Sequence, residues 1–421
     1  MKKLLIINAS QVVTCEADNF KKGKSEMNEL GIIENGAIYI EDDIIKDIGK
    51  TKDLLEYKKE DVEVINAKNK TVLPGFIDSH THFVFGGYRD DEYSWRLEGM
   101  DYMEIMEKGG GIAKSVKQTK KATKASLIES SIKRLNSFTR FGVTTVEGKS
   151  GYGLDYDTEI KQLEVMKDVD KKHSLDVVST FLGAHSVPKE YEGRSEEFID
   201  FIIEKVLPEV KKRDLAEFCD IFTEKGVFSI KESRRLLTKA KNMGFKLKMH
   251  ADEIVQLGGA NLAGELKTTS ADHLLQASDE GIKALKENNV IATLLPATAF
   301  SLQEDFARAR YMIDNGLAVA VASDFNPGSC HTESIPLLIA LATIKMKMSI
   351  EETINGLTIN AAKAIDRSDK VGSLEIGKKA DVVIHDCPTY KFLAYHIGVN
   401  SVEKVIKNGK IILDKEIIGA L

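Results

Sequence analysis

The sequence contains few cysteines, and their spacing limits what they can do. Among 421 residues there are four, Cys15, Cys219, Cys330 and Cys387, and none of them forms a Cys-x-x-Cys pair. Cysteines this far apart do not build the disulfide framework of a small secreted domain. We therefore expect reduced thiols and a cytoplasmic protein.

Long hydrophobic runs and an excess of basic charge are also absent. The apolar run near the start covers only residues 4–7, too short for a signal peptide, and no later run approaches a membrane span. The formal net charge of −6 argues against a nucleic-acid partner, which requires a basic footprint. It does not exclude a small anionic substrate, because the local charge of a pocket can oppose the net charge. We expect neither membrane nor nucleic acid as a partner.

What the sequence does contain is a long alternation of strand and helix patterns. The hydrophobic fraction of 43% over 421 residues is enough for a large core. Amphipathic stretches with apolar residues at helical spacing separate the apolar runs. Eight strands that alternate with helices predict a (β/α)8 barrel over residues 73–365. The strand candidates are 72–77, 142–146, 176–182, 216–222, 246–249, 270–274, 290–295 and 318–322.

Both ends of the chain have a different, purely β character. Residues 1–72 contain short β-branched runs separated by acidic or glycine turns, and residues 366–421 contain two hairpin patterns. Two β segments that flank a barrel join most simply into one unit. We therefore expect a small, discontinuous, β-sandwich-like domain built from residues 1–72 and 366–421.

The histidine pair His80 and His82 stands at the end of the first barrel strand. Residues i and i+2 of a strand point to the same face, so these two imidazoles aim at one point. Five of the nine histidines fall at or just beyond expected strand ends, namely His80, His82, His185, His250 and His273. Barrel active sites lie at the carboxyl ends of the strands. This distribution favours a metal site over buried structural histidines.

The expected metal ligands are His80, His82, His250 and Asp324, from the ends of strands one, five and eight. Three imidazoles and a carboxylate suit a first-row metal such as zinc or iron, with one position left open for water. Zinc is the expected metal and iron the alternative; the sequence does not decide between them.

Several blocks of the sequence resemble the amidohydrolase superfamily, and the resemblance covers nearly the whole chain. They are residues 74–82, 250–253, 271–273, 322–324 and, in the tail, 372–381. Many members of this superfamily hold two metals bridged by a carboxylated lysine near the end of strand four. Here strand four, 216–222, contains no lysine, and we interpret Lys225 as structural. Lys149 follows strand two and is not its counterpart, so we expect one divalent or trivalent metal per chain.

More narrowly, four blocks resemble the imidazolonepropionase family: residues 80–89, 147–154, 183–185 and 323–329. The resemblance implies hydrolysis of the cyclic amide of 4-imidazolone-5-propanoate to N-formimidoyl-L-glutamate, a step of histidine degradation. A homodimer is expected from this resemblance and from the frequency of twofold assemblies.

Three residues are expected to move protons in this reaction. Asp324, at the metal, can accept a proton from water, and His273 is placed to act as a base and to polarise the carbonyl. Glu253, three residues after His250, can handle a ring nitrogen and protonate the leaving amine. Which of Glu253 and His273 carries the decisive proton stays open. The alternative for Glu253 is a carboxylate at a helix N-terminus.

Six residues are expected to bind the substrate besides Glu253. Arg89 can grip the propionate in two-point contact, or it forms a surface ion pair with Asp90 or Asp91. The others expected to complete the pocket are Tyr152, His185, Asn326, Gly328 and Ser329.

Two other functions remain open at this point. A purine or pyrimidine deaminase of the same superfamily would share the histidine pair, the His-x-x-Glu and the aspartate. It would not need the grouping of Arg89, Tyr152 and His185 for a carboxylate. A superfamily member that has lost its chemistry and serves as a scaffold is the second alternative, and the intact ligand set at separate strand ends argues against it.

Overall fold

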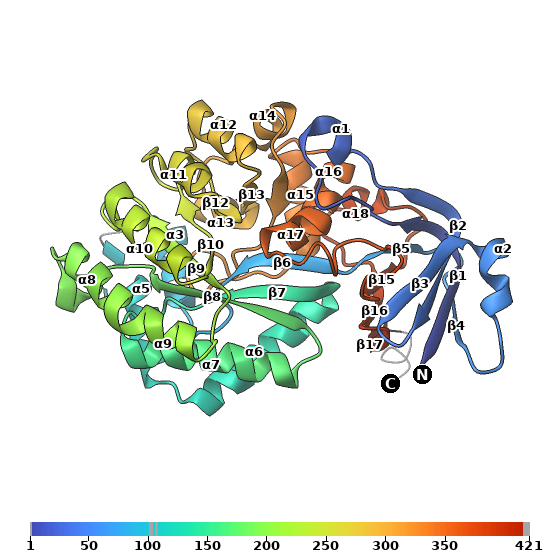
Figure 1. Ribbon diagram of the computed structural model, residues 1–421, viewed down its shortest axis with the longest axis horizontal. Coiled ribbons are helices and arrows are strands. Elements are labelled where there is room, and N and C mark those ends of the chain that lie inside the picture. The colour runs from blue at the N-terminus through green and yellow to red at the C-terminus, as the bar shows by residue number, and fades with distance from the viewer. Residues whose placement is uncertain (1, 101–103, 106–107, 416–421) are drawn as a thin grey trace.

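The computed structural model describes residues 2–100, 104–105 and 108–415. It contains two sheets (Figure 1). One forms a barrel whose strands run through the middle of the chain, and the other joins strands from both ends of the chain. No helix among the described residues is long and apolar enough to span a membrane.

The barrel strands are parallel and follow one another around the sheet in chain order. The first and last positions meet through a bridge between Thr81 and Phe325 and a bond from the amide of Asp324 to the carbonyl of His80, 3.0 Å. The (β/α)8 expectation is therefore confirmed. The strands are β6 (Phe76–Thr81), β7 (Val143–Lys149), β8 (Asp176–Ala184), β9 (Phe218–Thr223), β10 (Lys246–Leu247) with β11 (His250–Ala251), β12 (Ser270–His273), β13 (Ile291–Leu294) and β14 (Val319–Val321).

Helices surround the barrel, and several begin at side-chain caps. Thr123, Asp155 and Ser229 each accept a bond from a backbone amide in the first turn of α6, α7 and α10. The helices of this region are α3 (Asp90–Leu97), α5 (Ile112–Lys121), α6 (Lys124–Arg140), α7 (Tyr156–Lys172), α8 (Ser195–Phe201), α9 (Leu207–Lys212), α10 (Ile230–Asn242), α11 (Gly259–Leu266), α12 (Asp279–Glu287), α13 (Pro296–Leu302), α14 (Ala309–Asp314), α15 (Ile335–Ile344), α16 (Ile350–Leu357) and α17 (Ile359–Ala364).

The second sheet confirms that both ends of the chain form one β unit. Its central contact is the antiparallel pairing of β5 with β15, in which Val382 lies opposite Pro74. We keep residues 1–72 with 366–421, and residues 73–365, as the proposed domain boundaries. The strands are β1 (Lys3–Val13), β2 (Ile32–Glu41), β3 (Ile44–Lys50), β4 (Glu63–Asn66), β5 (Thr71–Pro74), β15 (Val382–His385), β16 (Val402–Lys407) and β17 (Lys410–Asp414), with short helices α1 (Gly23–Met27), α2 (Thr51–Leu54) and α18 (Phe392–Tyr395).

The single strand expected over residues 72–77 is in fact two strands. The chain passes from one sheet to the other at Gly75, whose amide donates to the carbonyl of Asp381. A Cβ at Gly75 would lie 2.2 Å from Oγ1 of Thr144, so only glycine allows this close passage. β6 consequently starts at Phe76 and runs through His80.

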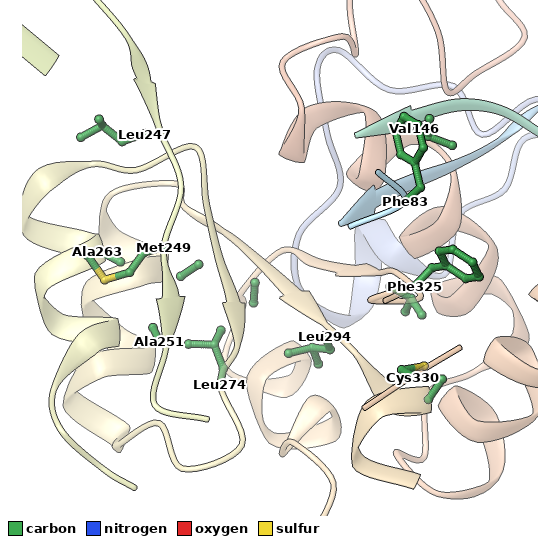
Figure 2. Packing of buried hydrophobic residues seen from close by; sticks show 14 of the residues in the cluster. Phe83, Val146, Leu247, Met249, Ala251, Ala263, Leu274, Leu294, Phe325 and Cys330 are labelled. Carbon is green, nitrogen blue, oxygen red and sulfur yellow. The ribbon is translucent and has the colours of Figure 1, made fainter. Parts of the chain in front are cut away.

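One large apolar cluster anchors the strands that carry the site. Figure 2 shows Met249, Ala251 and Leu274 beside the helix that carries Ala263, and Phe83 beside Val146; all are buried in this cluster. Burying a side chain as large as Phe83, Met249 or Leu274 contributes about 1.5–3 kcal/mol. The packing fixes the strand ends from which the polar side chains project.

Candidate metal centre and active site

The three histidines expected to bind a metal converge. The ligand nitrogens of His80, His82 and His250 all lie within 4.8 Å of one another, and the side chains are buried. Oδ1 of Asp324 lies 3.5 Å from Nε2 of His80 and 3.4 Å from Nε2 of His82. His80 lies in β6 and His82 directly follows it, His250 lies in β11, and Asp324 lies in the turn after β14, so all four stand at strand ends.

The donor set fits a divalent metal ion. Nε2 of His80 and Nε2 of His250 are buried and have no hydrogen-bond partner among the residues that the structure describes. A buried polar atom without a partner is costly, and a metal ion would satisfy both nitrogens. Burial also lowers the pKa values of His80 and His82 well below the usual value. Neutral imidazoles keep the lone pair that a metal requires.

Two aspartates that the sequence analysis missed stand behind the ligands. Nδ1 of His80 lies 2.6 Å from Oδ2 of Asp272, and Nδ1 of His250 lies 3.0 Å from Oδ2 of Asp220. Such carboxylates fix the ring orientation of metal-ligating histidines. Their sequence signal was an aspartate within a strand candidate, at 220 in 216–222 and at 272 in 270–274.

The hydroxyl of Thr298 donates to Oδ2 of Asp324 over 2.7 Å, which leaves Oδ1 directed at the histidines. Burial raises the pKa of Asp324 to about 6, although the bond from Thr298 opposes this. Asp324 has a φ of +53°, an uncommon backbone conformation for a residue other than glycine. The sharp turn aims the carboxylate into the cluster.

Glu253 and His273 lie together beside the ligands. Oε1 of Glu253 is 3.4 Å from Nδ1 of His273, and the ring of His273 is 5.2 Å from that of His250. Burial, followed by the charge of Asp324, raises the pKa of Glu253 to about 8. Burial lowers the pKa of His273 well below its usual value. Glu253 precedes α11 by several residues, so it is not at a helix N-terminus.

Arg89 pairs with neither of the aspartates considered in the sequence analysis. Nε and Nη2 of Arg89 both lie 2.8 Å from Oε2 of Glu92. The pair is largely enclosed, with side chains 17% and 4% exposed. The guanidinium also lies over Gly328, where an added Cβ would be 2.0 Å from Nη1. Arg89 is therefore held against the loop that follows Asp324.

Tyr152 and His185 lie next to the histidine cluster. The ring of His185 stacks on His82 with a centroid distance of 4.9 Å, and Tyr152 is 5.4 Å from His185. Nδ1 of His185 is 3.1 Å from the carbonyl of Gly151. Burial lowers the pKa of His185 to about 3, so its ring is neutral and able to accept or donate a hydrogen bond.

The loop after Asp324 is held by Asn326. The Asn326 side chain donates to the carbonyl of Asp324 and to Oγ of Ser329, and its Oδ1 accepts the amides of Gly328 and Ser329, at 2.7–2.8 Å. Asn326, Gly328 and Ser329, which were expected to bind the substrate, thus hydrogen-bond to one another within the loop. Their hydrogen bonds hold the loop in a fixed conformation beneath Arg89.

A cavity of about 550 Å³ opens beside Arg89 and Gly328. The residues that line it include none of the three clustered histidines, but they include His331, to which the sequence analysis gave no role, together with Tyr88 and Phe300. The cavity gives Arg89 an approach for a small molecule.

With this geometry established, comparisons with known proteins identify the family. The sequence model of the amidohydrolase family matches residues 71–412. The chain belongs to the amidohydrolase family. This amidohydrolase is 61% identical to the imidazolonepropionase of Clostridium tetani, over 99% of this chain and 100% of that one. It is 55% identical to the imidazolonepropionase of Parabacteroides distasonis, over 97% and 98% of the two chains.

Solved structures agree on the fold of the amidohydrolase. A zinc-bound adenosine deaminase from Xanthomonas campestris matches with a TM-score of 0.71 and 18% identity, over 98% of this chain and 93% of that one. The triazine hydrolase of Arthrobacter aurescens matches with a TM-score of 0.76 and 15% identity, over 99% and 96%. At these identities the likeness concerns the fold alone.

Proposed function

We propose that this amidohydrolase opens the ring of 4-imidazolone-5-propanoate with water to give N-formimidoyl-L-glutamate, in histidine degradation. The observation that carries the proposal is the full-length similarity to imidazolonepropionases, at 61% and 55% identity over nearly all of both chains. The site is compatible with it, because a metal-ligand cluster, proton-transfer groups and an enclosed arginine lie in one region.

His80, His82, His250 and Asp324 would hold one metal ion, zinc in our proposal and iron as the alternative. A metal ion in such a site lowers the pKa of water and polarises a carbonyl oxygen, the two aids that amide hydrolysis needs. Lys225 is exposed in the loop after β9, which supports a site without a bridging lysine.

Proton transfer is assigned to three side chains. Oδ1 of Asp324 faces the ligand nitrogens and would take the proton of the attacking water. His273 is neutral because of its burial and would act as a base or hold the carbonyl oxygen. Glu253, with a pKa raised to about 8, is protonated at neutral pH and would deliver its proton to the ring nitrogen that leaves.

The propionate of the substrate is assigned to Arg89, with Tyr152 and His185 at the side of the ring. Nη1 of Arg89 lies at Gly328 and makes no contact with Glu92 in the pair described above, so it remains able to meet a carboxylate. Asn326 and Ser329 would shape the floor beneath it. The enclosed position of Arg89 supports a strong charge contact.

A deaminase is disfavoured as an alternative. The adenosine deaminase structure shares 18% identity, far below the identity to the imidazolonepropionases. A neutral nucleobase would also give no role to Arg89. The scaffold alternative leaves the orphaned nitrogens of His80 and His250 unexplained.

We further propose a cytoplasmic homodimer. The four cysteines are buried and free, which is consistent with a reducing compartment. The dimer follows from the prevalence of twofold assemblies.

The test is direct turnover by the metal-loaded protein. We expect loss of imidazolone propionate and stoichiometric appearance of formimidoylglutamate, abolished by chelation and restored by zinc or iron. Release of ammonia from a purine or pyrimidine panel, with no reaction on imidazolone propionate, would refute the proposal in favour of deamination.

A further inference from the structure

A buried network of charges lies behind the metal ligands, centred on Lys149 at the end of β7. Its Nζ is 2.8 Å from Oε1 of Glu147, 2.9 Å from Oδ2 of Asp220 and 3.7 Å from Oδ2 of Asp272. All four side chains are 0% exposed. A buried ammonium surrounded by three carboxylates needs an explanation, because desolvating charges is costly.

Two of these carboxylates are the ones that contact the proposed ligands. Oδ2 of Asp220 is shared between Lys149 and Nδ1 of His250, and Oδ2 of Asp272 lies against Nδ1 of His80. Lys149 is therefore linked through one aspartate to His80 in β6 and through another to His250 in β11.

The remaining oxygens of both aspartates are also fixed. Oδ1 of Asp220 accepts the amides of Ile221 and His250, at 2.7 and 3.2 Å. Oδ1 of Asp272 accepts the hydroxyl of Ser270 at 2.6 Å. With both Oδ1 atoms held, the positions of the Oδ2 atoms depend on the cations that they face. Oδ2 of Asp220 faces Lys149, whereas Oδ2 of Asp272 faces Lys149 and also the equally buried Lys248, whose Nζ lies 3.8 Å away.

We propose that Lys149 is a positioning residue of the metal centre, whose ammonium holds Asp220 and Asp272 so that they aim His250 and His80 at a common point. This inference rests on the proposed metal site. Without the ammonium, the two carboxylates and Glu147 repel one another, and the rings that they orient lose their common direction. Groups that orient metal-ligating histidines typically change metal affinity about 10–100-fold when removed.

A second buried lysine provides a matched comparison. Nζ of Lys407, in β16, bridges Asp176 and Asp381 at 2.7 and 2.6 Å; the Lys407 side chain is buried, although Asp176 is half exposed. Asp176 begins β8, whereas the histidine cluster lies at the opposite ends of the barrel strands. The length of β8, nine residues at about 3.3 Å each, separates the two networks. A variant of Lys407 therefore shows how the loss of a buried bridging lysine affects folding without affecting the histidine cluster.

The experiment uses charge-balanced double variants and Co²⁺ as the probe. Lys149→Met with Glu147→Gln removes one charge of each sign from the site network, and Lys407→Met with Asp381→Asn does the same in the control. A single Glu147→Gln variant controls for the partner. Circular dichroism monitors folding, titration gives the Co²⁺ affinity, and the visible absorption of bound Co²⁺ reports the coordination geometry.

We expect the Lys149 double variant to fold, to bind Co²⁺ about tenfold more weakly and to show an altered Co²⁺ spectrum. The Lys407 double variant and Glu147→Gln should keep the unaltered spectrum and affinity, even where thermal stability falls. An unchanged spectrum and affinity in the Lys149 double variant would overturn the proposal. Its failure to fold would also overturn it, since Lys149 would then be required by the barrel itself.

Failure of the metal site is a separate outcome. If the unaltered protein binds no Co²⁺, the proposed ligand set is wrong and this inference falls with it. If the unaltered protein binds Co²⁺ but does not hydrolyse imidazolone propionate, the proposed substrate is wrong while the role of Lys149 is still decided by the spectra.

Discussion

Replacing Arg89 with alanine tests whether Arg89 binds the carboxylate of the substrate or only forms a structural ion pair with Glu92. The guanidinium is held by Glu92, and Nη1 lies against Gly328. If it meets the propionate of the substrate, Arg89→Ala removes one partner of a largely desolvated charge pair in the complex. The loss should appear in substrate binding while metal content is retained.

The magnitude follows from the enclosure of the pair. Truncating one partner of a buried charge pair costs about 2–5 kcal/mol, and about 1.4 kcal/mol corresponds to a factor of ten. We therefore expect kcat/KM to fall by about 30-fold or more. Arg89→Lys should recover only part of this, because an ammonium cannot reproduce the planar two-point contact.

The assay compares steady-state kinetics on imidazolone propionate with those on an analogue that lacks the carboxylate. Arg310→Ala is the matched control, because Arg310 is also partly exposed, at 30%, and pairs with the fully buried Glu352. Both alanine variants should lose stability, since each removes the arginine that pairs with a buried glutamate. Only Arg89→Ala should lose efficiency on the anionic substrate.

Two results would refute the reasoning. Unchanged kcat/KM in Arg89→Ala would make its contact with Glu92 structural and move the carboxylate pocket to Tyr152 and His185. An equal loss on the analogue without a carboxylate would show that Arg89 supports the whole site rather than the charge of the substrate.

Four further predictions concern the metal, the proton-transfer groups, the loop and the assembly. Fully active protein should contain one metal per chain, and elemental analysis that finds two would contradict the expected ligand set. Glu253→Gln and His273→Asn should each lower kcat about 10²–10⁴-fold with metal content unchanged. Asparagine is chosen at position 273 because it tolerates the φ of +75° there. Loss of the metal in His273→Asn would show that His273 is a metal ligand. Gly328→Ala should raise KM at nearly constant kcat, because its Cβ displaces the Arg89 guanidinium; an unchanged KM would show that the guanidinium is not needed there. Light scattering should give twice the chain mass, and a mass of 46.6 kDa at micromolar concentration would exclude the dimer.

The barrel was predictable because its signals are local. Apolar runs, helical periodicity and their alternation are properties of short windows, and the rule that sites gather at strand ends then placed His80, His82, His250 and Asp324 together. The exception was the strand expected at 72–77. Its division depends on the approach of Thr144 to Gly75, a contact between segments about seventy residues apart.

The contact between Arg89 and Glu92 follows from helix spacing and could have been predicted from the sequence. Arg89 immediately precedes α3, and Glu92 lies three residues on, in its first turn. Residues at i and i+3 of a helix are neighbours, whereas i+1 and i+2 face away. The sequence analysis considered Asp90 and Asp91, which are adjacent in the chain but point elsewhere.

The network around Lys149 required information that no local pattern carries. Alternation along β7 places Glu147 and Lys149 on one face, but it does not say which residues of other strands meet them. Asp220 and Asp272 come from β9 and β12, and their meeting with Lys149 depends on the order of the strands and on the tilt of the closed barrel. An aspartate within each of these strands was the visible sign that the barrel interior is polar at this level. Such a layer is tolerated because each charge faces another, and it lies directly beneath the point where three histidines converge. The same closure that hides the network from sequence analysis therefore brings residues in or just after six barrel strands, β6, β7, β9, β11, β12 and β14, together around one proposed metal centre.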